Sequence, residues 1–237
     1  MQIDTGKISL IQIEPDGNRV AQIDCNPRLF PRPGTYLLAH NPNELDRVLG
    51  CVLFPVGLPA SLEGGMNSGT FSLAPIPRTW HPGTNLELRG PLGHGFDLPP
   101  AVNSLALVAL AETAGRLLPL IPFALENNVD IAVFTDLSLP QLPPIVEIHS
   151  LNAIPEAISW ADFLAIDIPL ENIPSLREML QLSPHDYLAC PAQVLVSTPM
   201  PCAGVAECGI CALPWRKKGY ALACKDGPVF NLNQLQW

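Results

Sequence analysis

Hydrophobic positions in the first 98 residues come in short, partly alternating runs that are separated by glycine and proline. Such runs are typical of β-strands that turn one face toward a core. The pattern predicts strands at residues 7–13, 18–24, 35–40, 51–56, 70–75 and 84–89, with a hairpin turn at residues 15–18. Short strands at this spacing indicate a small, six-stranded β-barrel.

Residues 99–196 follow a different pattern, in which continuous apolar runs alternate with helical periodicity. The apolar runs predict buried strands at residues 104–110, 129–135, 145–149, 163–168 and 193–197. Helices are predicted between them at residues 113–126, 155–161 and 175–182, the first of them kinked or shortened by Pro119 and Pro122. Strands that alternate with helices indicate an α/β domain with a mostly parallel sheet.

The last stretch, residues 197–237, contains four of the seven cysteines, Cys202, Cys208, Cys211 and Cys224, with the spacing C-x5-C-x2-C-x12-C. Clustered thiolates repel one another, so they are stable together only when they form disulfides or hold a cation. The spacing resembles that of plant-type [2Fe–2S] proteins, with one extra residue in the first gap. Four thiolates also suit tetrahedral zinc. From spacing alone, iron–sulfur and zinc carry comparable weight, and a disulfide framework comes third.

Composition narrows the classes of function. The chain has 237 residues, of which 48% are hydrophobic and 15% are charged, so it is long enough to bury a sizeable core. A net charge of −9 argues against a nucleic-acid partner, because a phosphate backbone calls for a basic surface. The most apolar stretch, residues 98–125, is broken by charged residues and prolines and is a poor membrane span.

The N-terminal residues do not read as an export signal, so we expect a cytoplasmic protein without membrane attachment. In a reducing cytoplasm, clustered thiols more often bind metal than form disulfides.

The residues around the cysteines are more specific than their spacing. MPC at 200–202, ECGIC at 207–211 and CKDGPVF at 224–230 resemble the C-terminal iron–sulfur segment of the dihydroorotate dehydrogenase electron transfer subunit. This is an iron–sulfur flavoprotein family of the ferredoxin reductase superfamily. PGTYLL at 33–38 and RGPLGHGF at 89–96 resemble two landmarks of its flavin-binding barrel.

The resemblance implies that Cys202, Cys208, Cys211 and Cys224 are the ligands of a [2Fe–2S] cluster. It also implies three parts: a flavin-type barrel at residues 1–98, a nucleotide-binding-like α/β domain at 99–196 and a cluster-binding segment at 197–237.

Two motifs of that family are missing. After the first α/β strand, where the family has a glycine run for the pyrophosphate, this chain has VALAETA at residues 108–114. Its side chains would block close approach and Glu112 would repel phosphate, so we expect nicotinamide binding to be lost. At residues 50–57 the flavin motif Arg-Pro-x-Ser is absent as well.

The missing arginine disfavours FAD but leaves it open, because Arg47 or Arg89 would be able to replace it. If FAD is retained, the residues expected to contact it are Tyr36, His40, Arg89, Gly90 and Gly93. For Tyr36 and His40, ordinary packing in the barrel is the preferred alternative.

The sequence thus predicts an electron-transfer subunit rather than a stand-alone enzyme. Its [2Fe–2S] cluster would relay electrons to or from an FMN-containing, dihydroorotate-dehydrogenase-like catalytic subunit in a hetero-oligomer. The alternative is a non-redox accessory protein in which a four-cysteine zinc site stabilises a degenerate reductase fold. The missing motifs argue against a third hypothesis, an intact FAD- and NAD-linked reductase.

Overall fold

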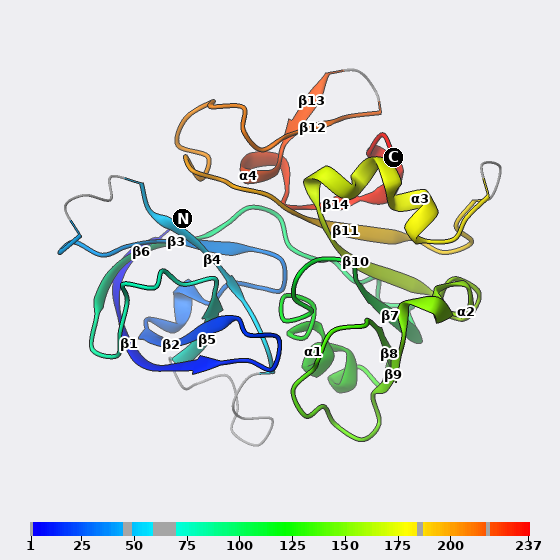
Figure 1. Ribbon diagram of the computed structural model, residues 1–237, viewed down its shortest axis with the longest axis horizontal. Coiled ribbons are helices and arrows are strands. Elements are labelled where there is room, and N and C mark those ends of the chain that lie inside the picture. The colour runs from blue at the N-terminus through cyan, green and yellow to red at the C-terminus, as the bar shows by residue number, and fades with distance from the viewer. Residues whose placement is uncertain (1, 45–48, 59–69, 184–186, 217–218) are drawn as a thin grey trace.

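The N-terminal part of the chain forms a closed barrel of antiparallel strands, as the sequence predicts. The computed structural model describes residues 2–44, 49–58, 70–183, 187–216 and 219–237. The barrel has the strand order β1-β2-β5-β4-β3-β6 (Figure 1). Its strands are β1 (Gln2–Ile13), β2 (Arg19–Cys25), β3 (Tyr36–His40), β4 (Cys51–Pro55), β5 (Thr70–Ala74) and β6 (Asn85–Leu92), with a 3₁₀ turn η1 (Pro27–Leu29) after β2.

Alternating side chains fill the interior of the barrel. On β6, Leu86 and Leu88 are buried while Asn85 and Glu87 face outward. The buried residues of the barrel form one hydrophobic cluster, in which Trp80 is the largest side chain. The period of two along each strand therefore produces a filled barrel core.

The second sheet has six strands in the order β14-β11-β10-β7-β8-β9. Five of them are parallel, namely β7 (Ser104–Ala109), β8 (Asp130–Phe134), β9 (Glu147–His149), β10 (Phe163–Pro169) and β11 (Ala192–Ser197). The edge strand β14 (Val229–Asn231) pairs antiparallel with β11. It comes from the C-terminal stretch, which the sequence did not predict to join this sheet.

The middle of the parallel sheet is buried on both faces, which explains the continuous apolar runs in the sequence. Along β7, Leu105 and Leu107 belong to one hydrophobic cluster, whereas Ala106 and Val108 belong to another. The first cluster lies beneath α1 (Leu120–Glu126), and the second includes α2 (Ile154–Trp160) and α3 (Leu176–Met179).

Two of the three predicted helices are shorter than expected, α1 and α3, whereas α2 has the predicted length and is displaced by one residue. The helix expected at residues 113–126 begins only at Leu120, because Pro119 lies immediately before it and the preceding residues form turns. Short 3₁₀ segments, η2 (Leu151–Ala153), η3 (Leu170–Ser175) and η4 (Leu232–Gln234), complete the connections. Within the described ranges, no helix has the length and apolar character needed to cross a membrane.

The C-terminal residues 197–237, hereafter the cysteine segment, lie across the top of both the barrel and the parallel sheet in Figure 1. They form a hairpin of β12 (Ala212–Pro214) and β13 (Tyr220–Leu222), followed by the short helix α4 (Ala223–Asp226). One hydrophobic cluster contains Tyr36 and Phe54 of the barrel, Ile166 of the sheet, and Cys224 and Phe230 of the segment. The cysteine segment is therefore built into the core.

A buried ion pair joins the loop after β7 to strand β10. The guanidinium of Arg116 donates to both carboxylate oxygens of Asp167, at 2.7 and 3.0 Å. Asp167 is fully buried, and its main-chain oxygen accepts a hydrogen bond from Leu110. Burial raises the pKa of Asp167, and the Arg116 charge offsets part of that rise.

Replacing Arg116 with alanine should lower the free energy of unfolding by about 3–5 kcal/mol, because it leaves a buried carboxylate unpaired. The loss should be smaller in acid. The folded variant binds a proton on Asp167 more readily than the unfolded chain does, so the variant loses stability as pH rises. Urea denaturation at acid and neutral pH measures both effects. Arg78→Ala, at an exposed arginine, is the control, and an equal loss in both variants would contradict the interpretation.

Candidate metal centre

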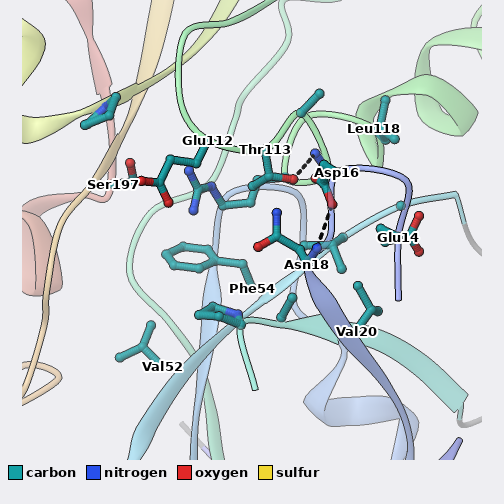
Figure 2. Close-up of a pocket in the computed structure, with 18 of the residues that line it drawn as sticks. Glu14, Asp16, Asn18, Val20, Val52, Phe54, Glu112, Thr113, Leu118 and Ser197 are labelled. Atoms are coloured by element: carbon teal, nitrogen blue, oxygen red, sulfur yellow. Dashed lines mark hydrogen bonds between the residues drawn. The ribbon is translucent and has the colours of Figure 1, made fainter. Parts of the chain in front are cut away.

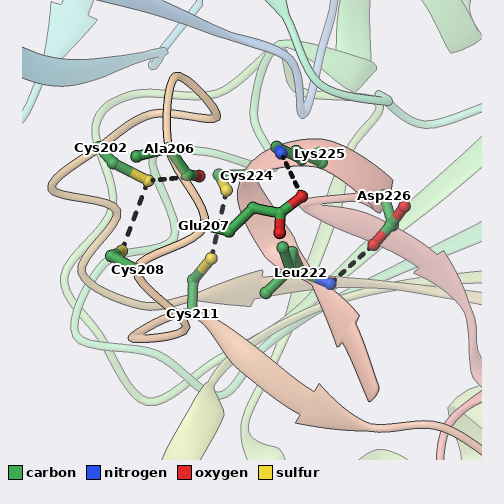
Figure 3. A network of polar contacts seen from close by, with 9 residues as sticks. All are labelled: Cys202, Ala206, Glu207, Cys208, Cys211, Leu222, Cys224, Lys225 and Asp226. Atoms are coloured by element: carbon green, nitrogen blue, oxygen red, sulfur yellow. Dashed lines mark hydrogen bonds and ion pairs between the residues drawn. The ribbon is translucent and has the colours of Figure 1, made fainter. Parts of the chain in front are cut away.

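The four predicted ligands come together as two pairs of thiols. The sulfurs of Cys202 and Cys208 lie 3.4 Å apart, and those of Cys211 and Cys224 lie 3.3 Å apart (Figure 3). The other three cysteines, Cys25, Cys51 and Cys190, are half-buried elsewhere in the structure. The structure thus separates the seven cysteines into the same two groups as the spacing does.

The hairpin explains how distant cysteines meet. Cys211 directly precedes β12, and Cys224 is the second residue after β13, so the pairing of Ala212 with Leu222 brings both thiols to the same end. The main-chain N–H of Ala223 donates to the carbonyl of Cys211 at 3.0 Å and fixes this end.

The loop that carries Cys202 and Cys208 is shaped by glycine. Gly204 and Gly209 have φ angles of +80° and +75°, a conformation that residues with a side chain rarely adopt. These turns let the main chain wrap around the thiols. Main-chain hydrogen bonds from Ala206, Gly204 and Cys208 to Cys202 favour its thiolate form and lower its pKa.

The thiols differ in how readily they ionise. Burial raises the pKa of Cys202, but hydrogen bonds with the main chain of Ala206 and with the Cys208 thiol outweigh it and lower the pKa to about 7. Burial raises the pKa of Cys224 to about 12, and the neighbouring Cys211 adds to the rise. A cation is therefore needed most beside Cys211 and Cys224, because a thiolate at Cys224 is the least stable on its own.

The two pairs of thiols also differ in burial. Cys208 is exposed and Cys202 is half-buried, whereas Cys211 and Cys224 are buried. One pair thus lies at the surface and the other lies in the core.

Each pair of thiols has a spacing that fits two ligands on one metal ion. Two thiolates on one tetrahedral ion, each about 2.3 Å from it, lie about 3.8 Å apart, close to the spacing within each pair. Across the part of the chain that the structure describes, no three His, Cys, Asp or Glu side chains gather around a single metal position. The assignment of the four cysteines as ligands stays a prediction.

Polar contacts hold the second half of the cysteine segment in shape. Asp226 accepts a hydrogen bond from the main chain of Leu222 at 2.7 Å, which ties the end of α4 to the end of β13. Lys225 of α4 forms an ion pair with Glu207, which lies in the loop between Cys202 and Cys208, at 3.3 Å. The ion pair is partly exposed, so its contribution to stability is small.

The barrel holds the cysteine segment through its tyrosine and its glycine-rich turn. The hydroxyl of Tyr36 donates to the carbonyl of Cys224 at 2.8 Å, within the buried interface. The main chain of His94 donates to the carbonyl of Gly227 at 2.6 Å and accepts from Val229 at 3.2 Å. The GPLGHGF and CKDGPVF stretches, which carry the family resemblance, are therefore in direct contact.

Gly93 is needed for this contact. Its φ angle is +74°, and a Cβ atom there would lie 2.6 Å from the carbonyl oxygen of Gly227 and 2.7 Å from Pro228. Gly90 is buried against Leu37, inside the barrel. Both glycines thus have a packing role.

A cavity of about 540 Å³ lies between the barrel and the carboxyl ends of the parallel strands. Figure 2 shows Thr113 between Glu112 and Asp16, above Phe54 and Val52 of the barrel. Its described lining does not include any of the five residues named for FAD: Tyr36, His40, Arg89, Gly90 and Gly93. Tyr36 is fully buried, which agrees with packing in the barrel. Arg47 lies outside the described residues.

The sequence reasoning identified Glu112 but missed the other charged residues of this cavity, Glu14, Asp16, Arg116 and Glu171. They come from turns and loops that are far apart in the chain, so no local pattern marks them.

Comparison with known proteins agrees with this architecture. Residues 199–236 match the family model of the iron–sulfur cluster binding domain of dihydroorotate dehydrogenase B. Over 172 residues the chain is 27% identical to the electron transfer subunit of dihydroorotate dehydrogenase B (NAD(+)) from Clostridium perfringens. That match covers 63% of this chain and 65% of the relative, just under two thirds of its length.

Solved structures share the fold at low identity. An NADH-dependent reduced ferredoxin-NADP oxidoreductase matches with a TM-score of 0.70 and 16% identity, over 98% of this chain and 90% of its own. An Amycolatopsis cytochrome P450 reductase matches with a TM-score of 0.58 and 12% identity, over 77% and 67%. Ferredoxin-NADP⁺ reductase from Plasmodium falciparum matches with a TM-score of 0.52 and 14% identity, over 77% and 90%.

The barrel and the parallel sheet together define a ferredoxin-reductase-like fold, and its four-thiol segment matches an iron–sulfur cluster binding domain. Within that class, the chain is similar to the electron transfer subunit of dihydroorotate dehydrogenase B, and the resemblance inferred from its sequence is confirmed.

Replacing Tyr36 with phenylalanine should lower the free energy of unfolding by about 1–3 kcal/mol, because the buried carbonyl of Cys224 loses its donor. Urea denaturation measures the change, and limited proteolysis shows whether the cysteine segment loosens first. Tyr220→Phe is the matched control, since Tyr220 is 70% exposed. The role of the Tyr36 hydroxyl would be refuted by equal effects of the two substitutions.

Proposed function

We propose that this chain is the iron–sulfur electron-transfer subunit of a complex that resembles dihydroorotate dehydrogenase B. Cys202, Cys208, Cys211 and Cys224 would bind a [2Fe–2S] cluster. The observation that carries the proposal is the arrangement of four thiols in two close pairs, within the segment that matches the cluster-binding domain of that family.

The pairing favours two metal ions over one. A single tetrahedral zinc ion would need all four sulfurs at equal distances around one point. Two pairs of thiols suit a two-iron cluster, in which each iron takes two protein ligands. A four-cysteine zinc site remains the alternative that metal analysis distinguishes.

The protein would determine how the cluster behaves mainly through the surroundings of its ligands. When bound, a [2Fe–2S] cluster supplies electron transfer at a potential that depends on burial and on hydrogen bonds to its sulfurs. Cys211 and Cys224 provide a buried side, and the main chain of Gly204 and Ala206 provides polar contacts to Cys202.

We further propose that the partner is an FMN-containing, dihydroorotate-dehydrogenase-like catalytic subunit and that the two form a hetero-oligomer. The curated relative is, by its name, the electron transfer subunit of such an enzyme. The surface around the exposed Cys208 supports a contact there, because Val205 and Ile210 are 65% and 56% exposed. Exposed apolar side chains beside the thiols are suited to burial against another protein.

The decisive experiment is isolation of the native complex, with iron, acid-labile sulfide, zinc and flavin quantified in the same sample. A brown protein with equal iron and sulfide, whose visible absorbance is lost with dithionite, supports the proposal. A colourless protein with one zinc per chain supports the accessory-protein alternative and contradicts electron transfer.

Cys→Ser substitution at Cys202, Cys208, Cys211 or Cys224 should remove or strongly perturb the cluster. The same change at Cys25, Cys51 or Cys190 should leave it in place. Ligand binding is coupled to the folding of the ligand loop, so the four ligand variants should also become protease-sensitive after residue 197. Iron content and limited proteolysis of the seven variants test this. Equal iron loss from a variant of the second group would show that the four ligands are wrongly assigned.

A further inference from the structure

The cleft between the barrel and the parallel sheet is the position where α/β proteins usually bind ligands. It lies outside the carboxyl ends of the strands, and loops after β7, β8, β10 and β11 line one side of it. The barrel lines the other side. The chemistry of this lining therefore determines whether a dinucleotide can bind.

The charges in the cleft are the opposite of those a pyrophosphate needs. Four carboxylates line it, from Glu14 and Asp16 on the barrel and from Glu112 and Glu171 on the loops. Burial and the nearby Asp16 raise the pKa of Glu14. Burial also raises the pKa of Asp16, but hydrogen bonds, from Asn18 first and then Thr113, lower it below the usual value. Asp16 thus remains ionised in the cleft.

Among the described lining residues, the only cation is Arg116, and its charge is already paired with a carboxylate of the protein. It makes the two-pronged ion pair with the buried Asp167, and its guanidinium carbon lies 5.8 Å from the ring centre of Phe54. If Arg116 turned toward a phosphate, Asp167 would be left buried and unpaired.

The described part of the barrel wall offers no second cation. The residues of β4 and its continuation that face the cleft are Val52, Phe54 and Val56, all apolar. At the edge of the cleft, the main chain of Gly57 donates to the carbonyl of Gly115 at 2.9 Å. The two halves of the molecule thus contact each other directly here.

From this lining we infer that the cleft binds neither a flavin nor a nicotinamide dinucleotide, and that Arg116, paired with Asp167 on one wall and lying over Phe54 of the other, is the internal cation that joins the two walls. The inference deepens the proposed function, since it makes the cluster the only redox group that this chain holds. The residues that keep the cysteine segment in place, Tyr36 and His94, lie outside the cleft lining and need no ligand there.

The test is equilibrium dialysis of the purified protein, with its iron and sulfide quantified, against FAD, FMN and NADH in turn. We expect no excess of any of the three in the protein compartment. One FAD, FMN or NADH retained per chain would overturn the inference. Missing iron in the same sample would instead contradict the proposed function, so the two failures are distinguishable.

A pair of charge variants tests the physical cause. Glu112→Gln combined with Glu171→Gln should lower the dissociation constant for FAD, measured up to millimolar ligand, because it removes two repelling charges from the cleft. Glu126→Gln combined with Glu178→Gln changes the net charge equally at exposed residues outside the cleft lining and should leave the constant unchanged. Equal constants in the two double variants would overturn the electrostatic explanation.

Discussion

The attachment of the cysteine segment on both of its sides is the constraint on which the rest of the structure depends. On one side, the barrel holds it through the Tyr36 hydroxyl and the main chain of His94. On the other side, β14 pairs with β11, with Phe230 opposite Val194. Because the segment is hydrogen-bonded to both neighbours, it also fixes how the barrel and the sheet lie against each other.

This attachment makes the two thiol pairs unequal. Cys224 is held between the barrel and the sheet, so its pair with Cys211 lies in the core. Cys202 and Cys208 lie in a glycine-containing loop, where Cys202 is half-buried and Cys208 is exposed. A metal group bound across the two pairs would have one protected side and one side near solvent. Such an arrangement suits a group that exchanges electrons with another protein.

Local patterns predicted most of the fold. The barrel strands follow from alternation in the sequence, and the parallel strands follow from apolar runs that are buried on both faces. The helix expected from residue 113 was too long, because Leu117 and Leu118 are buried in turns rather than on a helix. Apolar side chains indicate burial there, but they do not specify the backbone conformation that achieves it.

The site was predictable in its composition and less so in its contacts. The spacing and neighbours of the cysteines singled out the four thiols that the structure brings together. The contact of Tyr36 with Cys224 spans 188 positions, and nothing local marks it. The same limitation applies to the cleft, since Asp16 becomes part of its lining only when the loop that carries Thr113 folds against it.

The cleft and the cysteine segment share a wall, yet the contacts that hold the cysteine segment do not involve a ligand in the cleft. Met200 and Pro201 line the cleft, and Cys202 follows immediately. The described lining of the cleft consists largely of carboxylates and apolar side chains, with Arg116 as its cation. The bonds that hold the ligand loop and α4 come from the hairpin, the glycine-rich turn and β11, none of which depends on a cleft ligand. A substitution confined to the carboxylates of the cleft therefore leaves the hydrogen bonds that hold the cysteine segment unchanged.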